Sequence, residues 1–300
     1  MAYQNSSNGR ALRAQDSSDP ADGRGSRAPS AEDSLSRASL TRDRAVPFIV
    51  AIDGPGGSGK SSIARRIARE LNLHVLDSGA VYRCVALQAQ REGFTAKHVQ
   101  RLLEGKLPET RPDHWGTKGS IEHLIRIARE IDVRFEYDLK NDHQTVFLGE
   151  EVVTKDIRHQ DISTLTSFIA QVSEVRQALV QKQIDLAGTG CVAEGRDMAK
   201  IFPQAQVKIF LEADLVETAK RRVAQDAHIP LELVDKKSPL FRQTLKLLRE
   251  RNKRDSKQMS KSGYDKRINT TGKTLDGSTR KIVPLVVAAL DHYLSGSEED

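Results

Sequence analysis

The stretch that decides the fold is Pro47-Phe48-Ile49-Val50-Ala51-Ile52-Asp53-Gly54-Pro55-Gly56-Gly57-Ser58-Gly59-Lys60-Ser61. Its apolar run over residues 48–52 is continuous, which is typical of a parallel strand that is covered on both faces. Glycines then interrupt the strand, and beyond them apolar side chains recur at helical spacing, at Ile63, Ile67 and Leu71. The stretch therefore predicts a strand, a glycine-rich loop and an amphipathic helix in succession.

Further strand-like runs follow along the chain. They are His74-Val75-Leu76, Val133-Arg134-Phe135, Thr145-Val146-Phe147-Leu148, Cys191-Val192-Ala193 and Val207-Lys208-Ile209-Phe210-Leu211. Segments with a helical pattern separate them. Because alternating strands and helices favour a parallel sheet with helices on both faces, we predict an α/β fold with a doubly wound parallel sheet.

Two segments interrupt this alternation within one domain predicted over residues 47–295. Residues 109–162 hold two strand-like runs joined near Asn141-Asp142, a turn-forming pair, after a helical stretch over residues 121–131. Residues 227–263 are strongly basic. Long insertions on a compact core usually cover a substrate or act as lids, so we predict a substrate-binding insertion and a basic lid.

The N-terminal residues 1–46 are predicted to be a disordered tail. They are mostly Ser, Arg, Asp, Ala and Gly, and few large apolar side chains occur among them. Such a segment buries too little apolar surface to offset the entropy of ordering. Its acidic residues argue against a transit peptide, so we expect a solvated extension.

The composition excludes several classes of protein. The 300 residues are 38% hydrophobic and 5% aromatic, with no apolar run long enough for a membrane span and no secretory signal. Two cysteines without metal-site spacing favour a reducing cytoplasm. The net charge of +6 fits small anionic substrates, and we find no basic stripe interleaved with aromatic residues. We therefore expect no nucleic-acid or membrane partner. We also expect a monomer.

The glycine-rich loop matches the Walker A pattern of Gly, four residues, Gly, Lys and Ser or Thr. Its backbone N–H groups can surround phosphate oxygens, while Lys60 reaches the β- and γ-phosphates and the Ser61 hydroxyl ligates magnesium. The pattern predicts ATP and Mg²⁺ as cofactors. The predicted nucleotide-binding residues are Gly54, Pro55, Gly56, Gly57, Ser58, Gly59, Lys60, Ser61 and Ser62. Asp53 either orders water near the metal or caps the amides of the loop.

The Walker A pattern alone does not identify the acceptor. The long additional domains of a motor are missing from the sequence. An acceptor that carries a phosphate needs fixed guanidinium groups, and Arg83, Arg176 and Arg196 are candidates. Cytosine could be separated from uracil by a carboxylate that accepts from its amino group beside an arginine that donates to its ring.

The sequence resembles the bacterial type of cytidylate kinase. The motifs that carry the resemblance are Asp77-Ser78-Gly79-Ala80-Val81-Tyr82-Arg83, Ile157-Arg158-His159-Gln160, Ser167, Val175-Arg176-Gln177-Ala178-Leu179, Glu194-Gly195-Arg196-Asp197-Met198 and the run over residues 202–213. The resemblance spans about residues 47–222. It implies ATP-dependent phosphorylation of CMP, dCMP or both.

The resemblance also implies roles for particular residues. Ser167, Arg176 and Asp197 would contact the edge of the base. Ser78, Arg83 and Arg196 would hold the phosphate of the acceptor. Tyr82 is either a further substrate contact or a core aromatic residue.

Two places depart from the family pattern. Glu194 stands where the family usually has Asp, a carboxylate that binds magnesium through water, so we expect altered metal geometry. The lid run Arg251-Asn252-Lys253-Arg254-Asp255-Ser256-Lys257-Gln258 has Asn and Gln where the family has Asp and Arg. We expect Lys60, Arg251, Arg254 and Asp255 to be catalytic, although Lys253 or Lys257 could also reach the phosphates.

Two other functions stay open at this point. The chain could phosphorylate another small acceptor, or it could bind CMP and ATP as a regulatory module whose catalysis is weakened by the altered lid and Glu194. The sequence does not decide between CMP and dCMP.

Overall fold

The computed structural model describes residues 47–106, 119–138, 141, 143–256, 259 and 262–295. The predicted tail 1–46 lies outside these residues. So do the start of the predicted insertion, Asp142 of the predicted turn, and Lys257 and Gln258 of the lid run.

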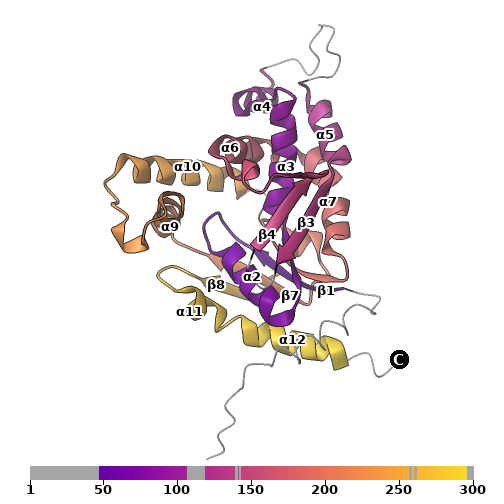
Figure 1. Ribbon diagram of the computed structural model, residues 1–300, viewed down its shortest axis with the longest axis vertical. Coiled ribbons are helices and arrows are strands. Elements are labelled where there is room, and N and C mark those ends of the chain that lie inside the picture. The colour runs from indigo at the N-terminus through magenta and orange to yellow at the C-terminus, as the bar shows by residue number, and fades with distance from the viewer. Residues whose placement is uncertain are drawn as a thin grey trace, which may run out of the picture.

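Five parallel strands form the main sheet, in the order β2-β6-β1-β7-β8 (Figure 1). Their bounds are Phe48–Asp53 for β1, His74–Asp77 for β2, Gly190–Gly195 for β6, Val207–Glu212 for β7 and Lys266–Asn269 for β8. Strand β1 is central, with β6 and β7 as its hydrogen-bonded neighbours. The predicted α/β fold with a parallel sheet is confirmed.

Both faces of β1 are buried. Phe48, Val50 and Ile52 pack with α2 (Lys60–Leu71) and α12 (Val283–Ser295). The intervening Ile49 and Ala51 pack on the other face with residues of α7 (Ser173–Ala187) and α8 (Met198–Ile201). Because successive side chains of a strand point to opposite faces, a strand covered on both sides needs a continuous apolar run. This packing explains the apolar sequence of residues 48–52.

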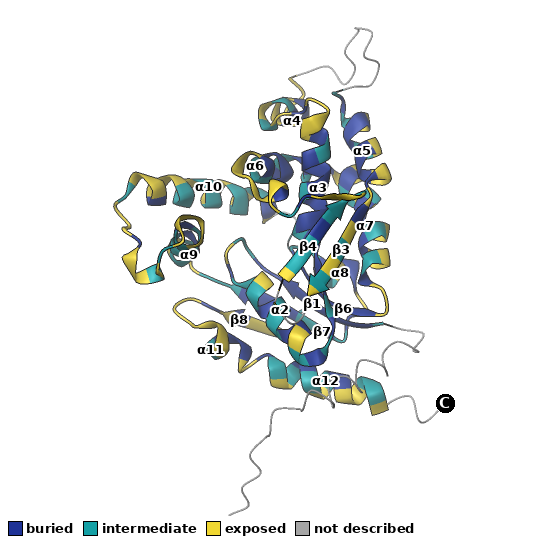
Figure 2. Cartoon of the chain, viewed as in Figure 1, coloured by how far each residue is buried: buried dark blue, intermediate teal, exposed yellow. Residues whose placement is uncertain are grey.

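A smaller antiparallel sheet and several helices surround a second core. The sheet contains β3 (Val133–Asp138), β4 (His143–Leu148) and β5 (Glu151–Val152). The helices are α3 (Ser78–Arg91), α4 (Ala96–Leu103), α5 (Ile121–Glu130) and α6 (Gln160–Ile169), with the turn η1 at Asp156–Arg158. Figure 2 shows the inward sides of α3 and α5 as buried. This core uses residues between Ala80 and Leu179, so the described part of the segment 109–162 packs together with α3 and α7.

Helices α9 (Leu215–Ala227) and α10 (Pro239–Asp255) project from the side of the sheet (Figure 1). The short turn η2 (Leu231–Leu233) lies between them, and a small apolar cluster joins the two helices through Val223 and Phe241. Helix α11 (Leu275–Thr279) precedes α12. None of the helices in the described ranges is long and apolar enough to cross a membrane. The segment predicted as a lid therefore contains a 17-residue helix, α10, with its C-terminal end near the glycine-rich loop.

The glycine-rich loop gives a prediction about stability. Gly57 and Gly59 both have left-handed backbone conformations, with φ of 76° and 91°. A Cβ atom at Gly57 would lie 2.9 Å from the Cβ of Thr218, whereas a Cβ at Gly59 would meet nothing within 4 Å. Both Gly→Ala changes should cost about 1–2 kcal/mol for the left-handed conformation, and Gly57→Ala about 1–3 kcal/mol more for the contact with Thr218.

Urea unfolding followed by circular dichroism measures the free energy of unfolding of both variants. We expect Gly57→Ala to be the less stable one. Equal losses for both variants would show that α9 moves away from the loop without cost.

Candidate active site

The loop between β1 and α2 presents the start of a helix to the solvent. Helix α2 begins at Lys60 and has no acidic residue in its first turn, so its free N–H groups and dipole favour an anion. Hydrogen bonds hold the loop in shape: Ser58 N donates to Pro55 O at 3.3 Å, and Thr270 Oγ1 donates to Ser58 O at 2.9 Å. The loop is therefore a preformed cradle for phosphate oxygens.

Lys60 lies within this cradle. Its Nζ atom donates to the carbonyl oxygens of Gly54 at 3.0 Å and Pro55 at 2.9 Å. Burial lowers the pKa of Lys60 to about 7, and the neighbouring Arg196 adds to this effect, while Glu194 opposes it. The environment thus disfavours the ammonium charge, and the negative charge of a polyphosphate would restore it.

Ser61 and Glu194 lie together and are the predicted metal ligands. The Ser61 side chain hydrogen-bonds to the Glu194 carboxylate. Burial raises the pKa of Glu194, and the nearby Asp77 acts in the same direction, while Lys60 opposes them. A hydroxyl and a carboxylate are hard oxygen donors that suit Mg²⁺, which completes its shell with waters and substrate phosphates. Within the described ranges no cluster of three or more His, Cys, Asp or Glu side chains could hold a metal.

A cavity of about 310 Å³ opens beside the glycine-rich loop. It brings together residues predicted for the nucleotide, the acceptor and the lid. Those that line it are Gly57, Gly59, Lys60, Ser61, Ser62, Ser78, Tyr82, Arg83, Ser167, Glu194, Arg196, Asp197, Arg251 and Asp255. The predicted residues that do not line it are Gly54, Pro55, Gly56, Ser58, Arg176 and Arg254. Segments that are far apart in the sequence therefore meet around one space.

Two arginines that line this cavity each have one buried donor atom without a hydrogen-bond acceptor. Arg83 Nη1 and Arg251 Nε each have no hydrogen-bond partner among the described residues. Their nearest carboxylate oxygens are those of Asp77 at 3.7 Å and Asp255 at 3.5 Å. An unsatisfied buried donor costs about 1–3 kcal/mol, which an anion with several oxygens would recover.

Arg196 connects the glycine-rich loop to the end of α10. Its Nη1 atom donates to Gly54 O, and its Nε atom lies 2.9 Å from Asp255 Oδ2. Asp255 is buried, with 7% of its side chain exposed, and also approaches Arg251. These contacts hold the end of α10 over the loop. Burial lowers the pKa of Arg251 to about 10, with Arg196 acting in the same direction.

The residues predicted for the edge of the base lie near one another. Burial raises the pKa of Asp197 to about 6, with Asp53 acting in the same direction and Arg176 opposing them. Arg176 Nη1 donates to Ala170 O at 2.9 Å, so this guanidinium is held beside the cavity but does not line it. Tyr82 is 8% exposed and belongs to the hydrophobic core, yet it also lines the cavity. Both interpretations of Tyr82 are therefore compatible with its position.

Asp53 does not cap the amides of the glycine-rich loop. Its carboxylate accepts hydrogen bonds from Met198 N at 2.8 Å and Ala199 N at 2.9 Å, and from the Tyr264 hydroxyl at 3.0 Å. The reason is the pairing of β1 with β6, which places Asp53 beside Gly195, just before α8. Asp53 thus fixes the segment that carries Asp197.

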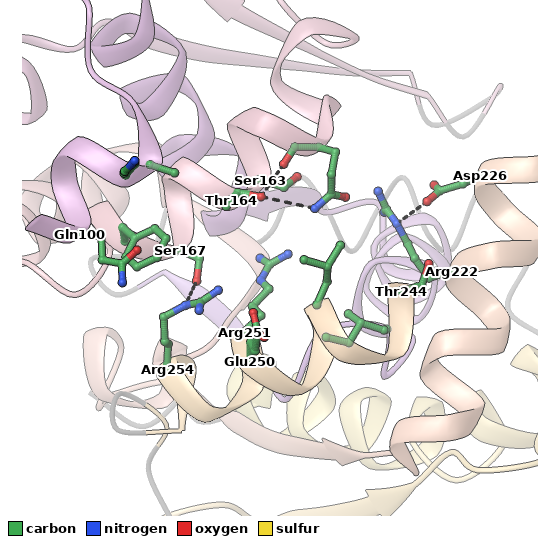
Figure 3. A pocket seen from close by; sticks show the side chains of 17 residues that line it. Gln100, Ser163, Thr164, Ser167, Arg222, Asp226, Thr244, Glu250, Arg251 and Arg254 are labelled. Atoms are coloured by element: carbon green, nitrogen blue, oxygen red, sulfur yellow. Dashed lines mark hydrogen bonds and ion pairs between the residues drawn. The ribbon is translucent and has the colours of Figure 1, made fainter. Parts of the chain in front are cut away.

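Arg254 lies in a neighbouring cavity of about 550 Å³ between α4, α6, α9 and α10 (Figure 3). Its Nε atom donates to Ser167 Oγ at 2.8 Å. Arg251 and Ser167 line both cavities, whereas Arg254 lines only this one. Of the predicted catalytic arginines of α10, only Arg251 therefore reaches the cavity that contains Lys60.

Sequence reasoning assigned no role to several residues of the site. Arg65, Arg158 and Arg222 line the smaller cavity. Arg158 stood in a recognised motif, but the motif gave it no function. Gln183 is fully buried on α7 and accepts a hydrogen bond from Ser78 Oγ at 2.6 Å. Nothing in the sequence distinguishes Gln183 from the other polar residues of its helix.

Comparisons with known proteins agree with this geometry. A family model described as cytidylate kinase matches residues 50–287. A cytidylate kinase of Ralstonia pickettii is 34% identical over 83% of this chain and 93% of its own length. A cytidylate kinase of Streptococcus agalactiae is 37% identical over 59% of this chain and 69% of its own length.

A bifunctional pantoate ligase/cytidylate kinase of Prochlorococcus marinus is 36% identical over 79% of this chain. The chain spans 42% of the length of that relative. The match of the family model covers most of the chain, and the Ralstonia pickettii relative is matched over nearly its whole length. The chain belongs to the cytidylate kinase family.

Proposed function

We propose that this protein transfers the γ-phosphoryl group of ATP to CMP, dCMP or both, with Mg²⁺, and so forms the diphosphate. The observation that carries the proposal is the common cavity: Lys60 lines it together with Arg83 and Arg196. A triphosphate on the loop and a monophosphate on the two arginines would then face each other. Family membership supports the same acceptor, since the relatives are named cytidylate kinases.

In this proposal the protein acts mainly by positioning and by charge. The amides of the loop and Lys60 hold the phosphates of ATP, while Arg83, Arg196 and Arg251 hold the phosphate of the acceptor. The bond from the γ-phosphorus to the bridging oxygen of ADP breaks as a bond to an acceptor phosphate oxygen forms. Ser61 and Glu194 would hold Mg²⁺, which neutralises charge on the phosphate oxygens.

The base would be selected beside the same cavity. We propose that Asp197 accepts from the amino group of cytosine, with Ser167 and Arg176 completing the contact. We also propose a domain over residues 47–295, in which residues 109–162 cover the acceptor and residues 227–263 form the lid. The free, buried cysteines Cys84 and Cys191 are compatible with a reducing cytoplasm.

An acceptor screen tests the function directly. The full chain is incubated with ATP and Mg²⁺, and ADP formation is measured with CMP, dCMP, UMP, AMP and no acceptor at equal concentrations. We expect turnover with CMP or dCMP. Turnover with another acceptor alone would support a different small-molecule kinase, and tight binding of CMP without product would support a regulatory module.

Removing the charge of Lys60 should stop the transfer. We expect Lys60→Ala to lower kcat by about 100-fold or more, because the variant lacks the ammonium group that stabilises negative charge on the transferring phosphoryl group. A coupled assay of ADP formation measures the change. Retention of full kcat would exclude Lys60 from the reaction, and circular dichroism checks that the variant is folded.

ATP binding should be coupled to proton uptake by Lys60. The pKa of this side chain is lowered to about 7, so at pH 8 it is mostly neutral, and nearby phosphates raise its pKa and cause it to bind a proton. We expect an uptake approaching one proton at pH 8 and a smaller uptake by Lys60 at pH 6, where the side chain is already charged. Calorimetry without Mg²⁺ in buffers of different ionisation enthalpy measures the uptake.

The matched control for this measurement is Lys60→Arg, which keeps a permanent positive charge. Its proton uptake at pH 8 should be close to zero. The same uptake in this variant would mean that another group takes the proton.

Arg83 should act on the acceptor and not on ATP. We expect Arg83→Met to raise the KM for CMP by about tenfold or more, because a forked donor to phosphate is lost, and to leave the KM for ATP nearly unchanged. Arg91→Met is the control on the same helix, since Arg91 is exposed and pairs with Glu151. Steady-state kinetics distinguish the two variants, and a change confined to the KM for ATP would contradict the assignment of Arg83.

A further inference from the structure

Near its C-terminal end, α10 contacts the substrate-side helix α6 through Arg254. Arg254 Nε donates to Ser167 Oγ at 2.8 Å, as the dashed line in Figure 3 marks. The guanidinium carbon of Arg254 also lies 4.8 Å from the centroid of the Phe168 ring, which is within the range of a cation–π contact. Two neighbouring residues of α6 therefore hold this guanidinium.

The hydrogen bond determines how Ser167 can meet a ligand. A hydroxyl group has one proton to donate and two lone pairs that accept. One lone pair of Ser167 Oγ is occupied by a charged donor, and no hydrogen bond in which this oxygen donates is found within the described ranges. The side chain is buried, with the residue 3% exposed, and it lines the cavity that contains Lys60. Its proton is therefore available to a ligand in that cavity.

The charge of Arg254 adds a second effect. A guanidinium ion next to Ser167 Oγ repels the positive end of another N–H group, so a second donor is disfavoured there. Cytosine and uracil differ in this respect, because N3 of cytosine is an acceptor and N3 of uracil carries a hydrogen. A hydroxyl that faces N3 and is restricted to donating therefore favours cytosine over uracil.

We propose that Arg254 is a positioning residue for base selection: by donating to Ser167 Oγ, it makes that hydroxyl a hydrogen-bond donor toward the base and favours CMP over UMP. This inference rests on the proposed function for the identity of the acceptor. It gives Arg254 a different task from that of an arginine at the transferring phosphate. That second task falls to Arg251, which lines the cavity around Lys60.

The test compares Arg254→Met with Arg249→Met. Methionine keeps much of the length of the side chain and its contact with Phe168, but it has no donor and no charge. Arg249 is an exposed residue of the same helix and serves as the matched control. The dissociation constants for CMP and UMP are measured by calorimetry, and kcat and KM are measured with both acceptors.

We expect Arg254→Met to weaken CMP binding by about tenfold and UMP binding by less than about threefold, so that the CMP/UMP preference falls. The fall in kcat/KM for CMP should come from a higher KM for CMP, and the KM for ATP should be unchanged. Arg254→Lys, which keeps the charge, should restore part of the preference. Combining Arg254→Met with Ser167→Ala should cost little more than Ser167→Ala alone, because the arginine acts through that hydroxyl.

Any of four outcomes would overturn the inference. Equal losses with CMP and UMP, or a loss in kcat alone, would make Arg254 a residue of the phosphate site. Additive effects of the two substitutions would remove the link through Ser167. If the wild-type chain bound UMP as tightly as CMP, there would be no base preference for Arg254 to support. Preferential binding of CMP without any transfer would refute the proposed function and leave this inference standing.

Discussion

Positive charge that is held out of water is the constraint on which the rest of the site depends. The N-terminal end of α2, Lys60 and several arginines surround one cavity, and some of their donor atoms are buried without an acceptor. Burial of these cations and their closeness to one another are both unfavourable, and both lower the pKa values of Lys60 and Arg251. Ligands that bring several negative charges remove the cost, which favours nucleotides over neutral acceptors.

The carboxylates of the site limit this repulsion. Glu194 and Asp255 each lie beside a cation of the cavity, and burial raises the pKa of Glu194 and of Asp197. The substitution of Glu for the usual Asp at residue 194 keeps the carboxylate next to Ser61. The carboxylate predicted to bind the metal is therefore carried here by a longer side chain on a buried strand.

Helix α10 connects the two halves of the site. At its end, Asp255 is bound by Arg196, which also contacts the glycine-rich loop, while Arg254 is bound by Ser167 on α6. Neighbouring residues of the helix thus reach both Arg196, next to the glycine-rich loop, and Ser167 on α6. If ATP and the acceptor bind as proposed, binding of either one changes the partners of one rigid element.

The sequence by itself determined the local chemistry. The continuous apolar run of β1, the glycines and Lys60 of the loop, and the strand-like runs of the other strands predicted the parallel α/β sheet and the phosphate cradle. These features are local, because strand burial, left-handed turns and helix starts depend on neighbouring residues. The motif positions also predicted that Ser78, Arg83, Arg196 and Asp197 would meet, and they line one cavity.

Only the tertiary structure decided where long side chains point and which partners they find. The sequence could not separate Arg251 from Arg254, because residues three apart share one face of a helix. Only the packing of α10 shows that Arg251 lines the cavity of Lys60 and that Arg254 binds Ser167. The sequence also could not reveal that Asp53 holds α8 or that Gln183 binds Ser78, since these pairs are 145 and 105 residues apart. Such contacts depend on how elements that are distant in the sequence pack together, and local sequence patterns do not predict that packing.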